Sequence, residues 1–195
     1  MTIPYKALSV TLATTGTGIV PPDRELPVHV TFENPALDSM TDLRHSAAIT
    51  VEPETALDVA EQRMKYGGVR LLFVVDLTGY LLGLVTLNDI KGERPVRFQR
   101  DMGVSHDEIL IRDIMTPAGR LEVISMEEVV ESRVGDIIQT LKRTGRQHAL
   151  VEERAATGTV IRGIFSATRI GRQLGVQIES SGVAWTFAEL ESALH

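Results

Sequence analysis

The sequence repeats one order of structural patterns twice, and this internal duplication limits the folds open to the chain. Each copy reads as a short strand, a helix, two strands joined by a turn, and a closing helix. The first copy spans about residues 36–91 and the second about 111–175. With 195 residues, 43% of them hydrophobic, the chain suffices for one sizeable domain or for two small ones that share a core.

The first copy is organised around a nearly unbroken apolar run, Val69 to Asp76, which predicts a strand buried on both faces. Gly67 and Gly68 precede it and are typical of residues just past a helix end. The other predicted elements are a strand from Ala48 to Val51, a helix that starts at Thr55-x-x-Asp58, a hairpin turn at Leu77 to Gly79, a strand from Tyr80 to Val85, and a closing helix from Thr86 to Lys91.

The second copy is slightly longer, which predicts an insertion at about Glu127 to Glu131. Its buried strand is shortened to Ala149–Val151, since Gln147 and His148 are polar. The remaining predicted elements are a strand from Glu122 to Met126, a helix carrying Val134, Ile137, Ile138 and Leu141, a turn from Ala155 to Thr159, a strand from Val160 to Phe165, and a helix from Ser166 to Leu174.

Three segments lie outside the copies. Residues 1–35 form an N-terminal extension in which two alternating stretches, Lys6 to Leu12 and Val28 to Phe32, predict a β-hairpin-like arm. Residues 92–110 form a linker that three arginines make basic, and its Ser105-to-Glu108 capping box opens a short helix. Residues 176–195 predict a C-terminal strand and helix. The three arginines, Arg94, Arg97 and Arg100, are interpreted first as a solvated cluster, and the alternative is that they bind phosphate or an acidic partner.

The strand-to-helix corner from Gly83 to Asp89 is the best candidate for a ligand site. Backbone N–H groups at a helix start bind phosphate, and the Asp89 carboxylate can accept hydrogen bonds from a ribose diol. Thr86 and Asp89 are equally a helix-capping pair, and the two roles are compatible. The second copy keeps the hydroxyl, as Ser166, but has Arg169 in place of the carboxylate. Arginine cannot accept a hydrogen bond, which argues against ribose binding at that corner. Arg169 would instead bind phosphate, or would fill the cleft and leave it empty.

Composition excludes several other functions. The net charge of −6 argues against nucleic acid as the main partner, and the lack of cysteine rules out disulfides and thiolate chemistry. No signal peptide or membrane-spanning run is present, which predicts a cytoplasmic protein with no membrane partner. The scattered histidines do not form a metal site, and no nucleophile–base pair or P-loop indicates an enzyme.

The duplicated order of elements and motifs resembles a pair of CBS domains, the small regulatory modules named after cystathionine β-synthase. In the first copy the resemblance rests on Met40-Thr41, the Val69-to-Asp76 strand and the Gly83-to-Asp89 corner. In the second it rests on Asp113 to Pro117 and on Gly163 to Ser166. The resemblance implies an α/β (α+β) fold of two tandem β-α-β-β-α units, packed with pseudo-two-fold symmetry and leaving two clefts. It also implies binding of AMP, ADP, ATP or S-adenosylmethionine, with no metal.

Applied to this sequence, the resemblance predicts two nucleotide-binding clefts, one better suited to the ligand (the better cleft) and one less suited (the weaker cleft). In the better cleft Asp89 would hold ribose and Arg146 would pair with phosphate, because a guanidinium can contact two phosphate oxygens. The alternative interpretation is that Arg146 and Arg70 flank buried strands and extend to solvent. The better cleft comprises Thr86, Asn88, Asp89, Leu121, Glu122, Val123, Arg146, Gln147 and His148. The weaker cleft comprises Ala47, Ala48, Val69, Arg70, Ser166, Thr168 and Arg169.

The sequence therefore predicts a stand-alone regulatory module that senses an adenine nucleotide and passes the signal to an unidentified protein partner. The alternative is a structural dimerisation protein whose clefts are vestigial. A homodimer is expected in either case, because CBS pairs commonly associate through their helices. The apolar residues of the 134–141 helix exceed what one small sheet needs, which favours the same expectation.

Overall fold

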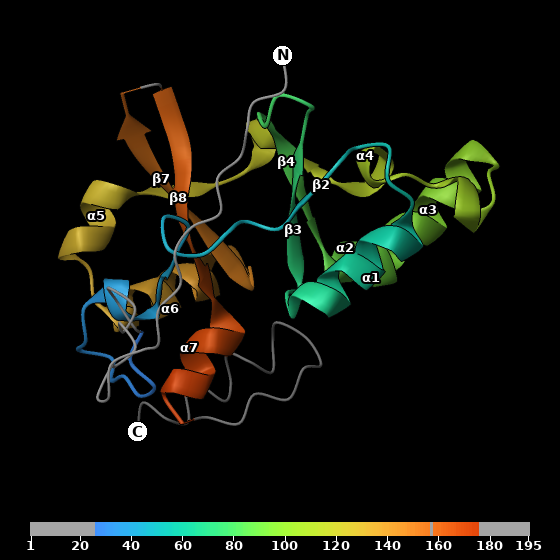
Figure 1. Ribbon diagram of the computed structural model, residues 1–195. Helices are drawn as coiled ribbons and strands as arrows, with labels where there is room; N and C mark the ends of the chain where they lie inside the picture. Colours follow the sequence, from blue (N-terminus) through green and yellow to red (C-terminus); the bar gives the residue numbers. More distant parts are fainter. Residues whose placement is uncertain (1–25, 157, 176–195) are drawn as a thin grey trace, which may run out of the picture.

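The computed structural model describes residues 26–156 and 158–175, and over these it is an α+β protein with two four-stranded sheets. The sheets face each other at the centre of the molecule, with helices on their outer sides (Figure 1). Buried side chains from both sheets, including Leu71, Phe73 and Leu150, form the cluster between them. The two-sheet, mixed class predicted from the sequence is confirmed.

The first sheet has the order β2-β3-β4-β5. Strand β3 is parallel to β2 and antiparallel to β4, and four of its five residues are buried, as its apolar sequence predicts. The strands are β2 (Thr50–Val51), β3 (Leu71–Val75), β4 (Leu81–Thr86) and β5 (Thr116–Pro117). The helices on its outer side are α1 (Leu57–Gly67), α2 (Leu87–Lys91), α3 (Glu93–Met102) and α4 (Ile111–Ile114).

The second sheet has the order β1-β8-β7-β6. Strand β7 is parallel to β6 and antiparallel to β8, and β8 is antiparallel to β1, which matches the pairings of the first sheet when the order is read from β6. Its strands are β1 (Thr41–Asp42), β6 (Val123–Ser125), β7 (His148–Ala155) and β8 (Gly158–Ser166). Its helices are α5 (Met126–Glu131), α6 (Val134–Thr144) and α7 (Ala167–Gln173). Short 3-10 helices lie at η1 (Ala36–Ser39), η2 (His106–Glu108) and η3 (Ala118–Arg120).

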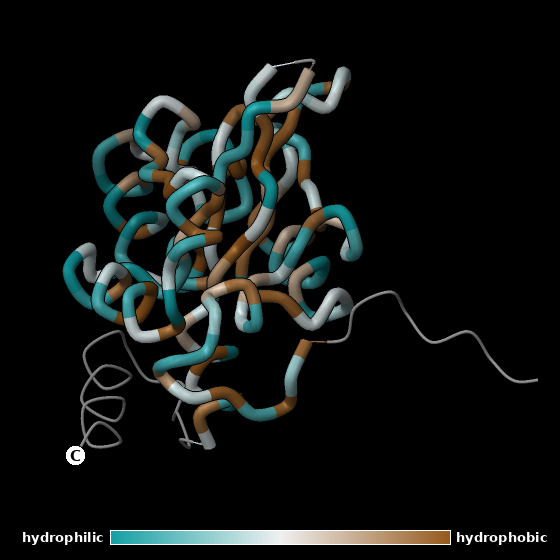
Figure 2. The backbone as a smooth tube through the Cα atoms, turned by 90° about the vertical axis from the view of Figure 1, so that its left-hand side faces the viewer, coloured by the Kyte–Doolittle hydropathy of each residue, from teal (hydrophilic) through white to brown (hydrophobic). Residues whose placement is uncertain are grey.

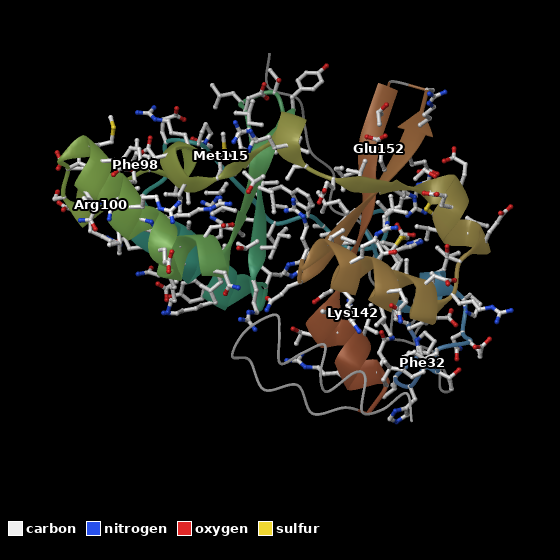
Figure 3. All side chains as sticks on the ribbon, turned by 180° about the vertical axis from the view of Figure 1, so that it is seen from behind. Phe32, Phe98, Arg100, Met115, Lys142 and Glu152 are labelled. Atoms are coloured by element: carbon white, nitrogen blue, oxygen red, sulfur yellow. The ribbon has the colours of Figure 1, made fainter. Side chains whose placement is uncertain are left out.

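Each copy lends one strand to the sheet of the other. Strand β1, from the first copy, pairs with β8, and β5, from the second, pairs with β4. The partner strands have a glycine at each crossing, where a β carbon would collide with main chain at Gly83 and would displace the Met40 side chain at Gly163. A β carbon at Gly83 would lie 2.5 Å from the main-chain oxygen of Thr116, and one at Gly163 would lie 2.6 Å from the Met40 sulfur. Figure 3 shows Met115, the residue before β5, beside the first sheet.

Hydrophobic residues concentrate on the central strands, and hydrophilic residues predominate on the outer helices and loops (Figure 2). One core lies between each sheet and its own helices. In the second of these, the four apolar residues of α6 are 0 to 3% exposed. These residues are buried within the chain and are not available for an interface, so they do not support the expected dimer.

Several local predictions are corrected. The segment predicted as a linker contains the ten-residue helix α3. Helix α1 begins at Leu57 after Ala56, so Thr55 is not its cap. Strands β7 and β8 are longer than expected, because polar residues at both ends of β7, from His148 to Arg154, pair with β8 in one long hairpin. The predicted insertion at 127–131 lies in helix α5.

The flanking predictions have different outcomes. Residues 28–32 are not part of a strand; only Pro35 forms an isolated bridge, to Arg133. The Ser105 capping box is confirmed, although it caps η2, and α4 is a separate helix. The expected strand at Lys6 to Leu12 and the expected C-terminal helix lie outside the described residues.

Candidate functional site

The corner at Thr86 is a complete capping box at the start of α2. The Asp89 backbone N–H donates to Thr86 Oγ1 over 3.2 Å. In return, Asp89 Oδ2 accepts hydrogen bonds from the Thr86 backbone N–H, at 2.8 Å, and from the Thr86 hydroxyl, at 2.7 Å. The predicted capping role is therefore confirmed, and it fixes the direction of the carboxylate. Oδ1 is the oxygen left to face a ligand.

That second oxygen has a partner that the sequence analysis did not assign. Arg94, in the first turn of α3, places Nη1 3.2 Å from Asp89 Oδ1. The same nitrogen donates to the main-chain oxygen of Ile114 over 2.6 Å and lies 3.3 Å from Thr116 Oγ1. Arg100 of the same helix lies instead at the outer edge of the molecule (Figure 3). Arg94 is thus a side chain of the site and not part of a solvated cluster.

A hollow of about 180 Å³ joins this corner to the start of β7. Six residues predicted for the better cleft meet here, so the structure brings together the corner and the Arg146 segment. The hollow also contains Arg70, which was assigned to the other cleft, and Arg94 and Thr116, which were assigned to neither. It is lined by Arg70, Leu84, Thr86, Leu87, Asn88, Asp89, Arg94, Thr116, Gly145, Arg146, Gln147 and His148.

The predicted wall formed by Leu121, Glu122 and Val123 is not in this hollow. Leu121 and Val123 line an apolar cleft between the two sheets, and Glu122 lines a neighbouring hollow that shares Arg146 and His148. The reason is the pairing of β5 with β4 opposite Gly83 and Leu84, which carries Thr116 to the corner in their place. Glu122 Oε2 accepts from Arg146 Nε over 2.7 Å, so this arginine is partly neutralised.

The weaker cleft is not assembled as predicted. Arg169 donates from Nη1 to Thr41 Oγ1 over 2.7 Å and lines a separate hollow with Met40, Asp42 and His45. The other predicted members do not line that hollow, and Ala48 and Arg70 line different ones. Pairing of β1 with β8 explains this, because it brings Thr41 to the Arg169 corner. The other members are Ala47, Ala48, Val69, Arg70, Ser166 and Thr168.

Thr116 and Thr41 occupy corresponding places at the two corners, and sequence reasoning missed both. A signal is present in the repeat of Met40-Thr41 as Met115-Thr116, which supports the resemblance but does not place either threonine in a cleft. Nothing in the local sequence indicates that these strands cross to the opposite sheet. Arg94 was missed because its helix was read as a linker.

His148 is held in its neutral form. Burial, and secondarily the positive charge of Arg70, lowers its pKa from 6.5 to about 4. At neutral pH the ring can therefore offer a hydrogen bond to a ligand but not a charge.

Within the described ranges, no cluster of three or more His, Asp or Glu side chains could hold a metal ion. No helix of the same part of the chain is long and apolar enough to cross a membrane.

Comparison with known proteins gives the family of one unit and the fold of the whole. Residues 40–94 match the family model described as CBS domain. No curated protein matches the sequence. A conserved protein from Pyrococcus horikoshii has a similar structure, with a TM-score of 0.55 and 22% identity over 78% of this chain and 100% of that one.

Two further structures carry the family name. CBSX2, from Arabidopsis thaliana and solved in complex with AMP, has a TM-score of 0.51 and 21% identity over 72% of this chain and 94% of its own. A conserved CBS domain protein from Thermoplasma acidophilum has a TM-score of 0.50 and 18% identity over 78% of each chain.

The depressed pKa of His148 predicts a dependence of stability on pH. The folded-state pKa lies below the unfolded value near 6.5, so the unfolded chain takes up the proton first as the pH falls. The contribution of His148 to the free energy of unfolding is complete above pH 6.5 and is lost towards pH 4. The loss is on the order of 1–3 kcal/mol.

Urea unfolding at several pH values checks this. Replacing His148 with Gln should flatten the stability profile between pH 4 and 6.5 relative to wild type. His106→Gln, at an exposed histidine, is the control and should leave the profile unchanged. Equal slopes for wild type and His148→Gln would contradict the assignment.

Proposed function

The chain is a CBS-domain protein with the fold of a CBS-domain pair, and from this we propose that it is a regulatory protein that binds an adenine nucleotide. The observation that carries the proposal is the hollow at Thr86. It combines a helix start, a carboxylate that faces inward and three arginines, Arg70, Arg94 and Arg146. Ribose hydroxyls would bind Asp89, and phosphate would bind the guanidinium groups. The ligand is AMP, ADP, ATP or S-adenosylmethionine.

The similarity to CBSX2, which was solved with AMP, supports an adenosine ligand. The Thr86 hydroxyl, which lies beside the Asp89 carboxylate, is engaged in the capping box of α2, so we propose binding without turnover. The bound state would then act on a protein partner in the cytoplasm. The Arg169 corner lacks a carboxylate in the place of Asp89, and we propose that it does not bind ribose.

One observation favours a second candidate, a scaffold with vestigial clefts. Both oxygens of Asp89 already have partners within the chain, and the hollow is smaller than the roughly 300–1,000 Å³ of most ligand pockets. A nucleotide must therefore displace at least one side chain. The experiments below separate a pocket that opens from one that does not.

Nucleotide binding should raise the melting temperature. At a ligand concentration near 100 times the dissociation constant, binding adds about 2.7 kcal/mol to the free energy of unfolding, a shift of several degrees. The measurement is a thermal-shift panel of AMP, ADP, ATP and S-adenosylmethionine, followed by titration calorimetry, which should give about one site per chain. A panel without any shift would favour the scaffold, and two equivalent sites would refute the role given to Arg169.

Asp89→Ala should weaken nucleotide binding about tenfold to a hundredfold, because charge-assisted hydrogen bonds to ribose contribute about 1.5–3 kcal/mol. The variant should also lose about 1 kcal/mol of stability with its cap. Asp89→Asn is the matched control, because it keeps an acceptor for the cap and removes the charge. Calorimetry and urea unfolding of both variants measure the two roles separately. Loss of stability with unchanged affinity would show that the corner is only structural.

We also propose a homodimer, formed through the helical faces. The support is not α6, whose apolar residues are buried, but α1, where Val59 and Tyr66 are 46% and 90% exposed. Tyr66→Glu should weaken such a dimer, because it places a charge in the interface. Sedimentation at micromolar concentration measures this. A wild-type protein that sediments only as a 21.4 kDa species would contradict the proposal.

A further inference from the structure

The two oxygens of Asp89 are not equivalent. Oδ2 accepts the two hydrogen bonds of the capping box, and breaking these would expose the start of α2. A ribose diol therefore has to bind at Oδ1. Arg94 Nη1 forms an ion pair with that oxygen at 3.2 Å, so ribose hydroxyls and the Arg94 guanidinium are attracted to the same acceptor.

Arg94 is positioned firmly but can be displaced. Its backbone belongs to the first turn of α3, and Nη1 also contacts the Ile114 carbonyl oxygen and Thr116 Oγ1, both from the segment that leads into β5. The side chain is nevertheless 49% exposed. Ion pairs at such exposure contribute roughly 0–1 kcal/mol, which a bound ligand can overcome.

The charges around the hollow determine which ligands can displace Arg94 from Asp89. Asp89 is the only carboxylate among the described residues that line it, against Arg70, Arg94 and Arg146. The carboxylate that pairs with Arg146, Glu122, does not line it. A neutral nucleoside that takes Asp89 leaves Arg94 beside two other guanidiniums without a new partner. Phosphates provide that partner, and they fit a forked, bidentate donor. A sulfonium ligand would add another positive charge.

We propose that Arg94 is a specificity-determining residue of this site. In the protein without ligand, Arg94 pairs with Asp89 Oδ1, the oxygen that would bind ribose. Arg94 gives up this ion pair only when the phosphates of a ligand provide its guanidinium with a new partner. The site thereby selects phosphate-bearing adenine nucleotides over adenosine and over S-adenosylmethionine. This inference rests on the proposed function.

The experiment compares the affinities of ATP and adenosine by titration calorimetry. In Arg94→Ala, adenosine should bind about two- to fivefold more tightly, because its competitor at Asp89 is gone. ATP should bind about tenfold more weakly or worse, because a charge-assisted contact to phosphate is lost. The preference for ATP over adenosine should thus fall by at least about twentyfold, whereas a purely structural Arg94 would leave it unchanged.

Two further variants control this result. Arg97→Ala removes an arginine from the same helix that pairs with Glu93 and does not line the hollow, and it should keep the wild-type preference. Arg94→Gln retains an amide donor for the Ile114 carbonyl oxygen and should lower the preference for ATP over adenosine in the same direction as Arg94→Ala. It replaces Arg94→Ala in the experiment if that variant does not fold.

The possible failures are distinguishable. If wild type binds ATP and the preference in the Arg94 variants equals that of Arg97→Ala, the role of Arg94 is refuted and the proposed function stands. If S-adenosylmethionine binds to wild type and no phosphate-bearing ligand of the panel does, the role of Arg94 is refuted and the proposed function stands. If neither adenosine nor any ligand of the panel binds to wild type, both proposals are refuted.

Discussion

The exchange of strands between the two copies is the constraint on which the rest of the structure depends. Strands β1 and β5 have only two residues each, too few to be stable alone, yet each completes the sheet of the opposite copy. Gly83 and Gly163 allow this close approach. An ion pair between Asp42 of β1 and Arg162 of β8, both largely buried, adds a second link between the copies. Neither sheet is complete without residues from both halves of the chain.

The same exchange builds the candidate site. Thr86 and Asp89 come from one copy and Thr116 and Arg146 from the other, so the hollow exists only where the copies meet. A ligand there would contact both copies and stabilise their contact. The opposite corner follows the same plan with different chemistry, because Arg169 contacts Thr41 where the first corner has a carboxylate. One architecture thus supports two corners whose key side chains differ, Asp89 at one and Arg169 at the other.

The segment between the copies contributes more than a connection. Helix α3 begins soon after α2 ends, and this short spacing brings Arg94 back over Asp89. The arginine links the end of the first copy to the segment that leads into β5, through the Ile114 carbonyl oxygen. The residues that join the copies and the residues that would bind a nucleotide are therefore partly the same. A change in the occupancy of the site would reach the junction directly.

The sequence by itself determined the duplication, the buried strand β3, the capping box at Thr86 and the difference between Asp89 and Arg169. These features depend on neighbours within a few residues, which local patterns record. Tertiary structure alone decided that β1 and β5 exchange sheets, that Thr116 replaces Leu121 at the corner, and that Arg94 reaches Asp89. Such contacts join segments far apart in the chain, and a two-residue strand has too short a pattern to indicate its partner. The corner could thus be found from sequence, whereas the residues that surround it could not.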